Sequence, residues 1–248
     1  MPTVQREDAT IYYEEHGPAT GQPLLLLAPG GLNSSIDFWG RMPLNPLEAF
    51  ADEFRIIAMD QRNAGRSRGP LQTIDAWAMY ADDQLAVLDH VGVDRTLVIG
   101  CCIGCSFIFK LLERARQRIT AGVLMQPIGN DETNPGTFGP EMWTPWGQNL
   151  IDNGAGFAMQ TVDAFGRSLF DAGFVFSVTR DFVRTVQTPL LLLFGSDRAH
   201  PRGVSVEVAS LLPNVEQIER WRDPDVVPQV LERMRNFLRA HQLVRAQP

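Results

Sequence analysis

The stretch Thr96-Leu97-Val98-Ile99-Gly100-Cys101-Cys102-Ile103-Gly104 decides the fold of this chain. Its first four residues predict a buried strand, and the segment 105–114 that follows predicts a helix. Cys102 therefore lies at a sharp strand-to-helix turn, in a pentapeptide with glycine at both ends. A turn of this kind presents its central residue above the carboxyl end of the strand.

The two glycines have a physical reason, because so tight a turn leaves no room for a Cβ at Gly100 or Gly104. The backbone at Cys102 is expected to be strained, and the N-terminus of the next helix favours thiolate over thiol. We therefore predict that Cys102 is the reactive residue, whereas Cys101 is expected to point into the core. The alternative for Cys102 is a small buried apolar residue, a common fate of free cysteine.

The spacing of Cys102 and Cys105 also satisfies Cys-x-x-Cys, so a redox switch is a second alternative, although the turn already explains the spacing. A zinc site is not expected. The three cysteines are too crowded to converge on one ion, and no nearby histidine completes four ligands. We predict neither a metal nor another cofactor.

Composition limits the class of partner and the cell compartment. The chain has 248 residues and a formal net charge of -7 at pH 7, which argues against binding nucleic acid or an anionic membrane. No apolar signal segment opens the sequence, and its apolar runs are too short to cross a bilayer. Clustered cysteines cannot form a disulfide framework, so a reducing, cytoplasmic location is expected.

Strands and helices alternate along most of the chain. Strands are predicted at residues 9–16, 24–28, 55–60, 96–99, 121–125, 190–194 and 215–219, the first of them as an edge strand. Helices are predicted around residues 36–51, 75–91, 105–114, 204–212 and 224–241. This alternation predicts an α/β fold with a mostly parallel central sheet covered by helices on both faces. Sites in such sheets lie at the carboxyl ends of the strands.

The segment 126–188 interrupts the alternation. It begins rich in Pro, Gly, Asn and Thr and continues as apolar helical stretches with many aromatic residues. We predict that it is a small lid or cap insertion in a core formed by residues 1–125 and 189–248. The alternative is a long surface loop, but its aromatic side chains need a surface on which to pack.

Four motifs in this order resemble the α/β-hydrolase-fold superfamily over nearly the whole chain. The first, after Tyr12-Tyr13-Glu14-Glu15-His16-Gly17, is Leu24-Leu25-Leu26-Leu27-Ala28-Pro29-Gly30-Gly31, which resembles the first core strand and the oxyanion loop. The second is Asp60-Gln61-Arg62-Asn63-Ala64-Gly65-Arg66-Ser67, which resembles the Asp-x-Arg-Gly-x-Gly-x-Ser signature. The third is the pentapeptide around Cys102. The fourth is Phe194-Gly195-Ser196-Asp197, which resembles the strand end that presents the catalytic acid.

The resemblance implies a nucleophile elbow at Cys102, written with cysteine where serine is usual. Dienelactone hydrolases and polyhydroxyalkanoate synthases also use cysteine at this position. The resemblance further implies an oxyanion hole made by the backbone N–H of Ile103 and that of Gly31 or Leu32. The alternative for residues 29–31 is simple turn chemistry.

The chain departs from the family at the general base. The family places a histidine in the loop after the last strand, but residues 215–225 contain none. Of the histidines present, His200 alone stands at a strand end, three residues after Asp197. We predict a catalytic set of Cys102, His200 and Asp197, with Asp223 as an alternative partner for His200. The competing interpretation is that His200 caps the following helix, with Pro201 at its first turn.

Three functional hypotheses remain open. The first is a cysteine-dependent hydrolase or acyl transferase acting on an ester, thioester or lactone of a small, largely apolar substrate. The second is a protein of this fold that binds a ligand or partner without turnover, and the third is a lyase or carbon–carbon bond hydrolase. Exposed lid aromatics would make a homodimer unsurprising. Four aromatic residues are candidates for an apolar substrate pocket or for lid-to-core packing: Phe38, Trp39, Trp143 and Trp146.

Overall fold

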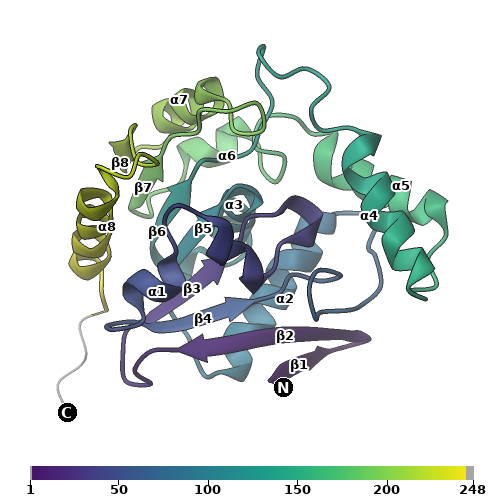
Figure 1. Ribbon diagram of the computed structural model, residues 1–248, viewed down its shortest axis with the longest axis horizontal. Coiled ribbons are helices and arrows are strands. Elements are labelled where there is room, and N and C mark those ends of the chain that lie inside the picture. Colours follow the sequence, from purple (N-terminus) through teal and green to yellow (C-terminus); the bar gives the residue numbers. More distant parts are fainter. Residues whose placement is uncertain (1, 244–248) are drawn as a thin grey trace.

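The strands of this chain form one sheet in the order β1-β2-β4-β3-β5-β6-β7-β8, as seen in a computed structural model that describes residues 2–243. Neighbouring strands are parallel from β4 through β8 in this order. β2 is antiparallel to both of its neighbours, β1 and β4. The mostly parallel sheet that the sequence predicts is therefore confirmed (Figure 1). The strands are β1 (Thr3–Arg6), β2 (Ala9–His16), β3 (Pro23–Leu27), β4 (Arg55–Met59), β5 (Thr96–Cys101), β6 (Ile119–Met125), β7 (Leu190–Leu193) and β8 (Val215–Ile218).

The strand predicted at residues 9–16 is confirmed as β2, but the prediction that it lies at the edge of the sheet is wrong. β1 pairs outside β2, with Thr3 opposite Tyr12 and Arg6 opposite Ala9. A tight turn joins the two strands, and Glu7 adopts a left-handed φ of 54° in it. Four residues are too few to show an alternating pattern, so the sequence gives no sign of β1.

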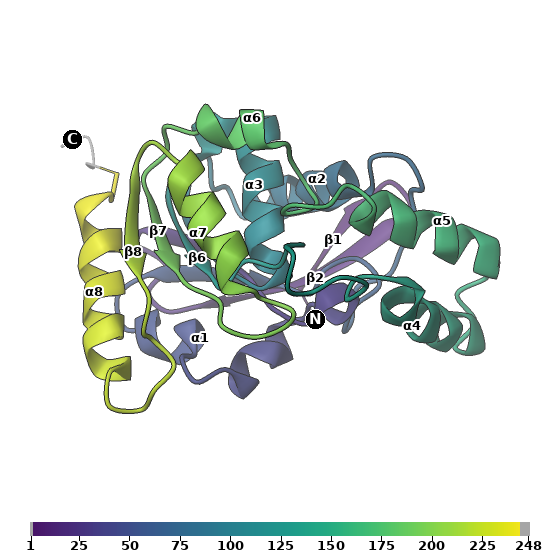
Figure 2. The ribbon, with the colours of Figure 1, turned by 90° about the horizontal axis from the view of Figure 1, so that it is seen from above.

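Helices cover both faces because successive strand residues point to opposite sides of the sheet. Leu25 and Leu27 pack with residues of α2, α3 and α7, whereas Leu24 and Leu26 pack with residues of α1 and α8. Figure 2 shows these two groups of helices on opposite sides of the sheet. The helices of the core are η1 (Gly31–Asn33), η2 (Ile36–Arg41), α1 (Pro46–Phe50), α2 (Ala76–His90), α3 (Ile103–Ala115), η3 (Arg116–Arg118), α7 (Arg202–Leu211) and α8 (Val227–Ala240).

The helix expected at residues 36–51 is instead two short helices, η2 and α1. Pro43 lies between the two helices, and Pro46 is the first residue of α1. Proline cannot donate the backbone hydrogen bond that a continuous helix needs. The break directs the chain from the loop after β3 back beneath the sheet (Figure 2).

The segment between β6 and β7 carries α4 (Pro140–Asp152), α5 (Met159–Phe170) and α6 (Arg180–Arg184). Figures 1 and 2 both show α4 and α5 at one end of the molecule, opposite α8, whereas α6 lies close to α3 and α7. Residues 1 and 244–248, which the sequence assigns to the core, lie outside the described residues. None of the helices described combines the length and hydrophobicity that crossing a membrane requires.

Candidate active site

Cys102 occupies the turn between β5 and α3, with a φ of 60° and a ψ of −119°. A Cβ on Gly100 would lie 2.4 Å from the carbonyl oxygen of Gly104, and a Cβ on Gly104 would lie 2.2 Å from that of Leu27. Both distances are far inside van der Waals contact, and backbone atoms cannot move aside. The turn therefore requires glycine at both positions, as the sequence predicts.

The three cysteines differ in their surroundings. Cys101 and Cys105 are fully buried, whereas Cys102 is half-buried, and all three thiols are free. Burial raises the pKa of the Cys101 and Cys105 thiols well above the ordinary value. The Cys105 sulfur lies 3.3 Å from the carbonyl oxygens of Gly100 and Met125. Within the part of the chain that the structure describes, no cluster of side chains could hold a metal ion.

His200 is oriented by Asp197, and both residues lie in the loop between β7 and α7. One carboxylate oxygen, Oδ1 of Asp197, lies 2.7 Å from the His200 Nδ1 atom and accepts the backbone N–H of His200 at 3.0 Å. The turn also depends on Gly195, because a Cβ there would lie 2.2 Å from the carbonyl oxygen of His200. The helix-capping alternative does not hold, since Pro201 is the N-cap residue of α7 and no side chain caps that helix.

The buried imidazole of His200 lies within interaction range of the Cys102 thiol, and each group shifts the pKa of the other. Burial opposes ionisation of the Cys102 thiol, but interaction with His200 outweighs it and lowers the pKa of that thiol. Burial likewise opposes protonation of His200, but Cys102 and Asp197 together raise the pKa of its imidazole. Among the described residues, the buried Nε2 atom of His200 has no partner of standard hydrogen-bond geometry. Both pKa shifts favour a thiolate–imidazolium pair.

Arg222 is a site residue that sequence reasoning missed. It lies in the loop after β8, where the family resemblance implies a histidine, and its Nη1 donates to Oδ2 of Asp197 at 3.1 Å. Its Nη2 donates to the Oε1 atom of Gln126. Burial opposes ionisation of Asp197, but His200 and Arg222 lower the pKa of the carboxyl. Asp223, the alternative partner for His200, instead accepts from Arg220 at the surface.

The backbone N–H groups beside the Cys102 sulfur come from Ile103 and Gly30, and both lower the pKa of the thiol. Ile103 is a predicted donor, whereas Gly30 was missed and precedes the other two candidates, Gly31 and Leu32, which lie in η1. Gly30 has a φ of 119°, which directs its peptide in a way that a residue with a Cβ rarely permits. The consecutive glycines Gly30 and Gly31 indicate in the sequence that this loop comes close to the sulfur, but they do not show which N–H group lies beside it.

Two of the four predicted pocket aromatics belong to η2. The Phe38 ring lies against the oxyanion loop, since a Cβ on Gly30 would be only 2.9 Å from it. Trp39 is fully buried and belongs to the hydrophobic cluster on the side of α1 and α8. Phe38 is thus next to the turn that carries Cys102, and Trp39 packs within the core.

The other two aromatics pack the insertion together. The Trp143 ring stacks on Phe170 with the centroids 6.1 Å apart, and its Nε1 donates to Oδ1 of Asp163 at 3.1 Å. The Trp146 ring stacks on Phe165 with the centroids 5.7 Å apart. Both tryptophans are buried in these contacts between α4 and α5, so the packing lies within the insertion, whereas the alternative from the sequence was packing of lid against core.

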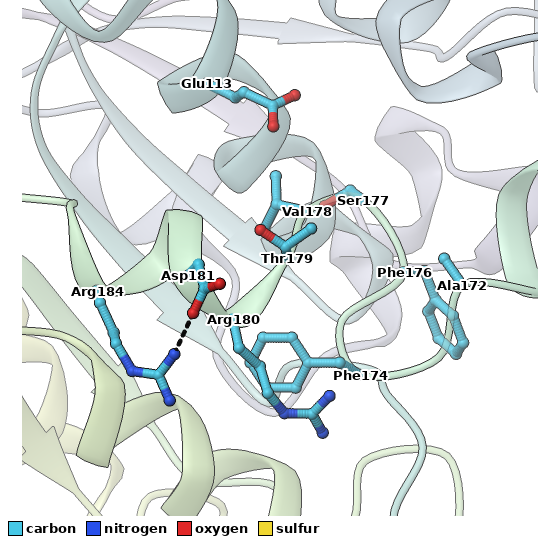
Figure 3. Close-up of a pocket in the computed structure, with 10 residues that line it drawn as sticks. All are labelled: Glu113, Ala172, Phe174, Phe176, Ser177, Val178, Thr179, Arg180, Asp181 and Arg184. Carbon is cyan, nitrogen blue, oxygen red and sulfur yellow. Dashed lines mark hydrogen bonds and ion pairs between the residues drawn. The ribbon is translucent and has the colours of Figure 1, made fainter.

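A surface pocket of about 500 Å³ lies beside the end of α3 and the start of α6, away from the group of residues around Cys102 (Figure 3). Its lining includes Glu113, Phe174 and Arg180, and none of its lining residues belongs to the group around Cys102. The pocket is therefore separate from the candidate active site.

Comparisons with known proteins agree with this fold. The family model described as alpha/beta hydrolase fold matches residues 23–161. A putative carbamate hydrolase, RutD of Variovorax paradoxus, is 38% identical over 94 residues, which are 38% of this chain but 34% of the relative. The chain thus matches about a third of the length of that relative.

Two further proteins match over most of the chain. Carboxylesterase YbfK of Bacillus subtilis is 24% identical over 233 residues, covering 84% of this chain and 77% of the relative. Among solved structures, a meta-cleavage product hydrolase from Pseudomonas fluorescens superposes with a TM-score of 0.70 at 16% identity. That superposition covers 97% of this chain and 98% of the other, so the whole fold is shared.

Proposed function

Because this chain belongs to the α/β hydrolase fold family, we propose that it is a cysteine-dependent hydrolase or acyl transferase. Its substrate is an ester, thioester or lactone of a small, largely apolar molecule, and the reaction passes through a thioester at Cys102. The observation that carries this proposal is the meeting of Cys102, His200 and Asp197 at the carboxyl ends of β5 and β7.

The nucleophile is the thiolate of Cys102. Its lowered pKa provides more thiolate near neutral pH than an ordinary cysteine has, and a thiolate needs no base to remove a proton before it attacks. The strained turn keeps the sulfur in one place above the sheet, so the attack begins from a fixed position. Two of the relatives are a putative carbamate hydrolase and a carboxylesterase, and this supports attack of the sulfur at a carbonyl carbon.

Acyl transfer then proceeds in two halves. The sulfur bonds to the carbonyl carbon, the C=O π electrons move to oxygen, and collapse expels the leaving group, which takes the proton from Nε2 of His200. Neutral His200 next removes a proton from water, whose oxygen attacks the thioester and releases the acid and the Cys102 thiolate. Asp197 holds the ring through Nδ1 and stabilises its protonated form in both halves.

The negative oxygen of each tetrahedral intermediate requires hydrogen-bond donors. We assign this role to the N–H of Ile103 and to the loop 30–32, from which Gly30, Gly31 or Leu32 donates. The proximity of Ile103 and Gly30 to the sulfur in the resting site supports this assignment.

The insertion 126–188 acts as a lid in this proposal. Met142 of α4 approaches the oxyanion loop, where its Cε would lie 3.6 Å from a Cβ on Gly31. Together with Phe38 beside Gly30, it gives the loop 30–32, whose Gly30 N–H lies beside the Cys102 sulfur, an apolar lining. This lining supports a small, largely apolar acyl group as the part of the substrate nearest the sulfur.

The first experiment follows the alkylation of each cysteine by iodoacetamide against pH, with labelled sites identified by mass spectrometry. We expect Cys102 to react with an apparent pKa below that of an ordinary thiol, and His200→Ala to raise it. Cys101 and Cys105 are internal controls, because both are fully buried. An inert Cys102, or a profile that His200→Ala leaves unchanged, contradicts the proposal and favours a protein that binds without turnover.

A second experiment separates acyl transfer from a lyase or carbon–carbon bond hydrolase in the same pocket. Cys102→Ala is expected to abolish turnover of activated esters and thioesters, with a loss on the order of 10⁴-fold or more. Trapping the thioester at Cys102 by mass spectrometry under acid quench gives a direct signature. A variant without the sulfur that keeps most of its activity indicates a reaction that needs only proton transfer.

A further inference from the structure

The beginning of the insertion is bonded to the turn that carries His200. The side chain of Asn134 is fully buried. Its Nδ2 donates to the carbonyl oxygen of Gly129 at 2.8 Å and to that of Arg198 at 3.1 Å. Arg198 lies between Asp197 and His200, so one amide joins the insertion to the middle of the acid–base turn.

A second contact follows the same path. The Nε atom of Arg198 donates to the Oγ1 atom of Thr137 at 3.0 Å. Behind it, Asp131 packs against α7, where a Cβ on Gly203 would lie 2.3 Å from an Asp131 carboxylate oxygen. Figure 2 shows the segment that leaves β6, in teal, running beside the green loop that leaves β7.

We propose that Asn134 is a positioning residue, which holds the carbonyl of Arg198 so that the turn from Asp197 to His200 keeps the imidazole directed at Cys102. It acts through the turn, since its hydrogen bonds are to backbone groups and not to the side chain of Cys102 or His200. The consequence for reactivity rests on the proposed function, whereas the effect on His200 itself does not.

The chemistry of the site calls for an amide. Nδ2 supplies two protons for two carbonyl oxygens, while Oδ1 accepts the backbone N–H of Asp131 at 2.9 Å. Alanine removes the hydrogen-bond partner that fixes these backbone groups, so the turn is free to move. Because asparagine is neutral, its loss changes the geometry around His200 without removing a charge.

The test measures the titration of the His200 imidazole by NMR and the pH profile of Cys102 alkylation, in the full chain and in Asn134→Ala. We expect the pKa of His200 to fall toward its ordinary value, and alkylation of Cys102 at about pH 6 to slow about tenfold. Thr137→Val, at a half-buried position, is expected to give a smaller shift in the same direction. It carries the test if Asn134→Ala does not fold.

Asn63→Gly is the matched control. Asn63 is also buried and also bonds two backbone groups, the N–H and the carbonyl of Gly69, but it does so in the turn after β4. Its φ of 61° suits glycine, so only the side chain is lost. We expect this variant to keep the wild-type His200 titration and Cys102 profile even if its stability falls.

The outcomes separate the two proposals. A wild-type His200 titration in both Asn134→Ala and Thr137→Val overturns the positioning role. A shift of equal size in Asn63→Gly also overturns it, because the effect would then follow from general loosening. If Cys102 is inert in the wild type but His200 still shifts in Asn134→Ala, the positioning role stands and the proposed acyl-transfer function fails.

Discussion

Asp197 and His200 belong to one turn, and this gives the site its unusual form. His200 lies three positions after Asp197 in the chain, and the Asp197 carboxylate binds both the ring and the backbone N–H of this histidine. The other carboxylate oxygen is left for Arg222, which arrives from the loop after β8. Hydrogen bonds on both carboxylate oxygens oppose rotation away from the ring, so local geometry favours one direction of the imidazole.

Replacing Asp197 by asparagine tests this role at the residue scale. The charge of Asp197 helps to raise the pKa of His200, so Asp197→Asn is expected to lower that pKa and, in turn, to raise the pKa of Cys102. Ester turnover should fall by on the order of 10²–10⁴-fold. The alkylation profile and the turnover assay measure the two effects.

Asp223→Asn is the control for this prediction, because Asp223 bonds to Arg220 at the surface. It is expected to leave both readouts as in the wild type. If Asp223→Asn has an effect equal to or greater than that of Asp197→Asn, the acid comes from the loop after β8, and the assignment to Asp197 is wrong.

Gly104 provides a second prediction at this scale. Gly104→Ala places a Cβ 2.2 Å from the carbonyl oxygen of Leu27, an atom fixed by the β3–β5 pairing. We expect a loss of roughly 2–4 kcal/mol in the free energy of unfolding, measured by denaturant titration. Gly40→Ala is the control, since a Cβ there has nothing within 4 Å. Equal stability of the two variants would mean that the turn is less tight than described.

At the scale of elements, close helix packing shapes the insertion. α4 and α5 approach each other through glycine: a Cβ on Gly147 would lie 2.1 Å from Val162, and one on Gly166 would lie 2.1 Å from the Trp143 ring. The aromatic residues of this segment therefore have a surface on which to pack, namely each other. The helix pair forms its own apolar contacts, and its buried side chains also belong to the hydrophobic cluster on the side of α2 and α3.

Gly166→Ala is expected to loosen this helix pair while leaving the sheet intact. The new methyl group cannot fit beside Trp143, so α5 must shift away from α4. Hydrogen exchange should rise in residues 140–170 and stay unchanged in β5 and β6. Arg167→Ala, on the exposed side of the same helix, should leave both regions protected. Uniform loss of protection across the sheet would show that the insertion and the core unfold as one unit.

At the scale of the whole molecule, the sheet separates two hydrophobic clusters, and Cys102 packs against both. The sulfur of Cys102 thus lies where the two faces meet, at the carboxyl ends of the parallel strands. Cys101 and Cys105 are enclosed on opposite sides of this boundary, in different clusters. The three thiols therefore report on different parts of the molecule during unfolding.

Cysteine labelling in rising guanidinium chloride should show this arrangement. Cys102 is half-buried and should label in the native protein, whereas Cys101 and Cys105 are fully buried and should label only as the chain unfolds. Their labelling is expected to follow the loss of the circular dichroism signal at the same midpoint. If Cys101 or Cys105 labels well before that midpoint, one face of the sheet opens independently of the other.

The α/β architecture, the order of the motifs and the tight turn at Cys102 could all be predicted from the amino-acid sequence. These follow from local patterns, since apolar runs, helical spacing and the glycines at 100 and 104 act over a few residues. The hairpin strand β1 was too short to leave such a pattern. The pocket aromatics were ambiguous because an apolar ring serves a pocket and a core equally well.

The groups that surround Cys102 could not be predicted from the sequence, because they come together only in the folded chain. His200 could have capped a helix, and Asp223 could have been its partner. The parallel order β5-β6-β7 brings the loops after β5 and β7 to the same end of the sheet, on either side of β6, and there His200 and Cys102 interact. Gly30 and Arg222 come from two further loops, after β3 and β8. Contacts between segments so distant in the chain depend on how the sheet stacks its strands and on side-chain direction, and neither is encoded in any short stretch of residues.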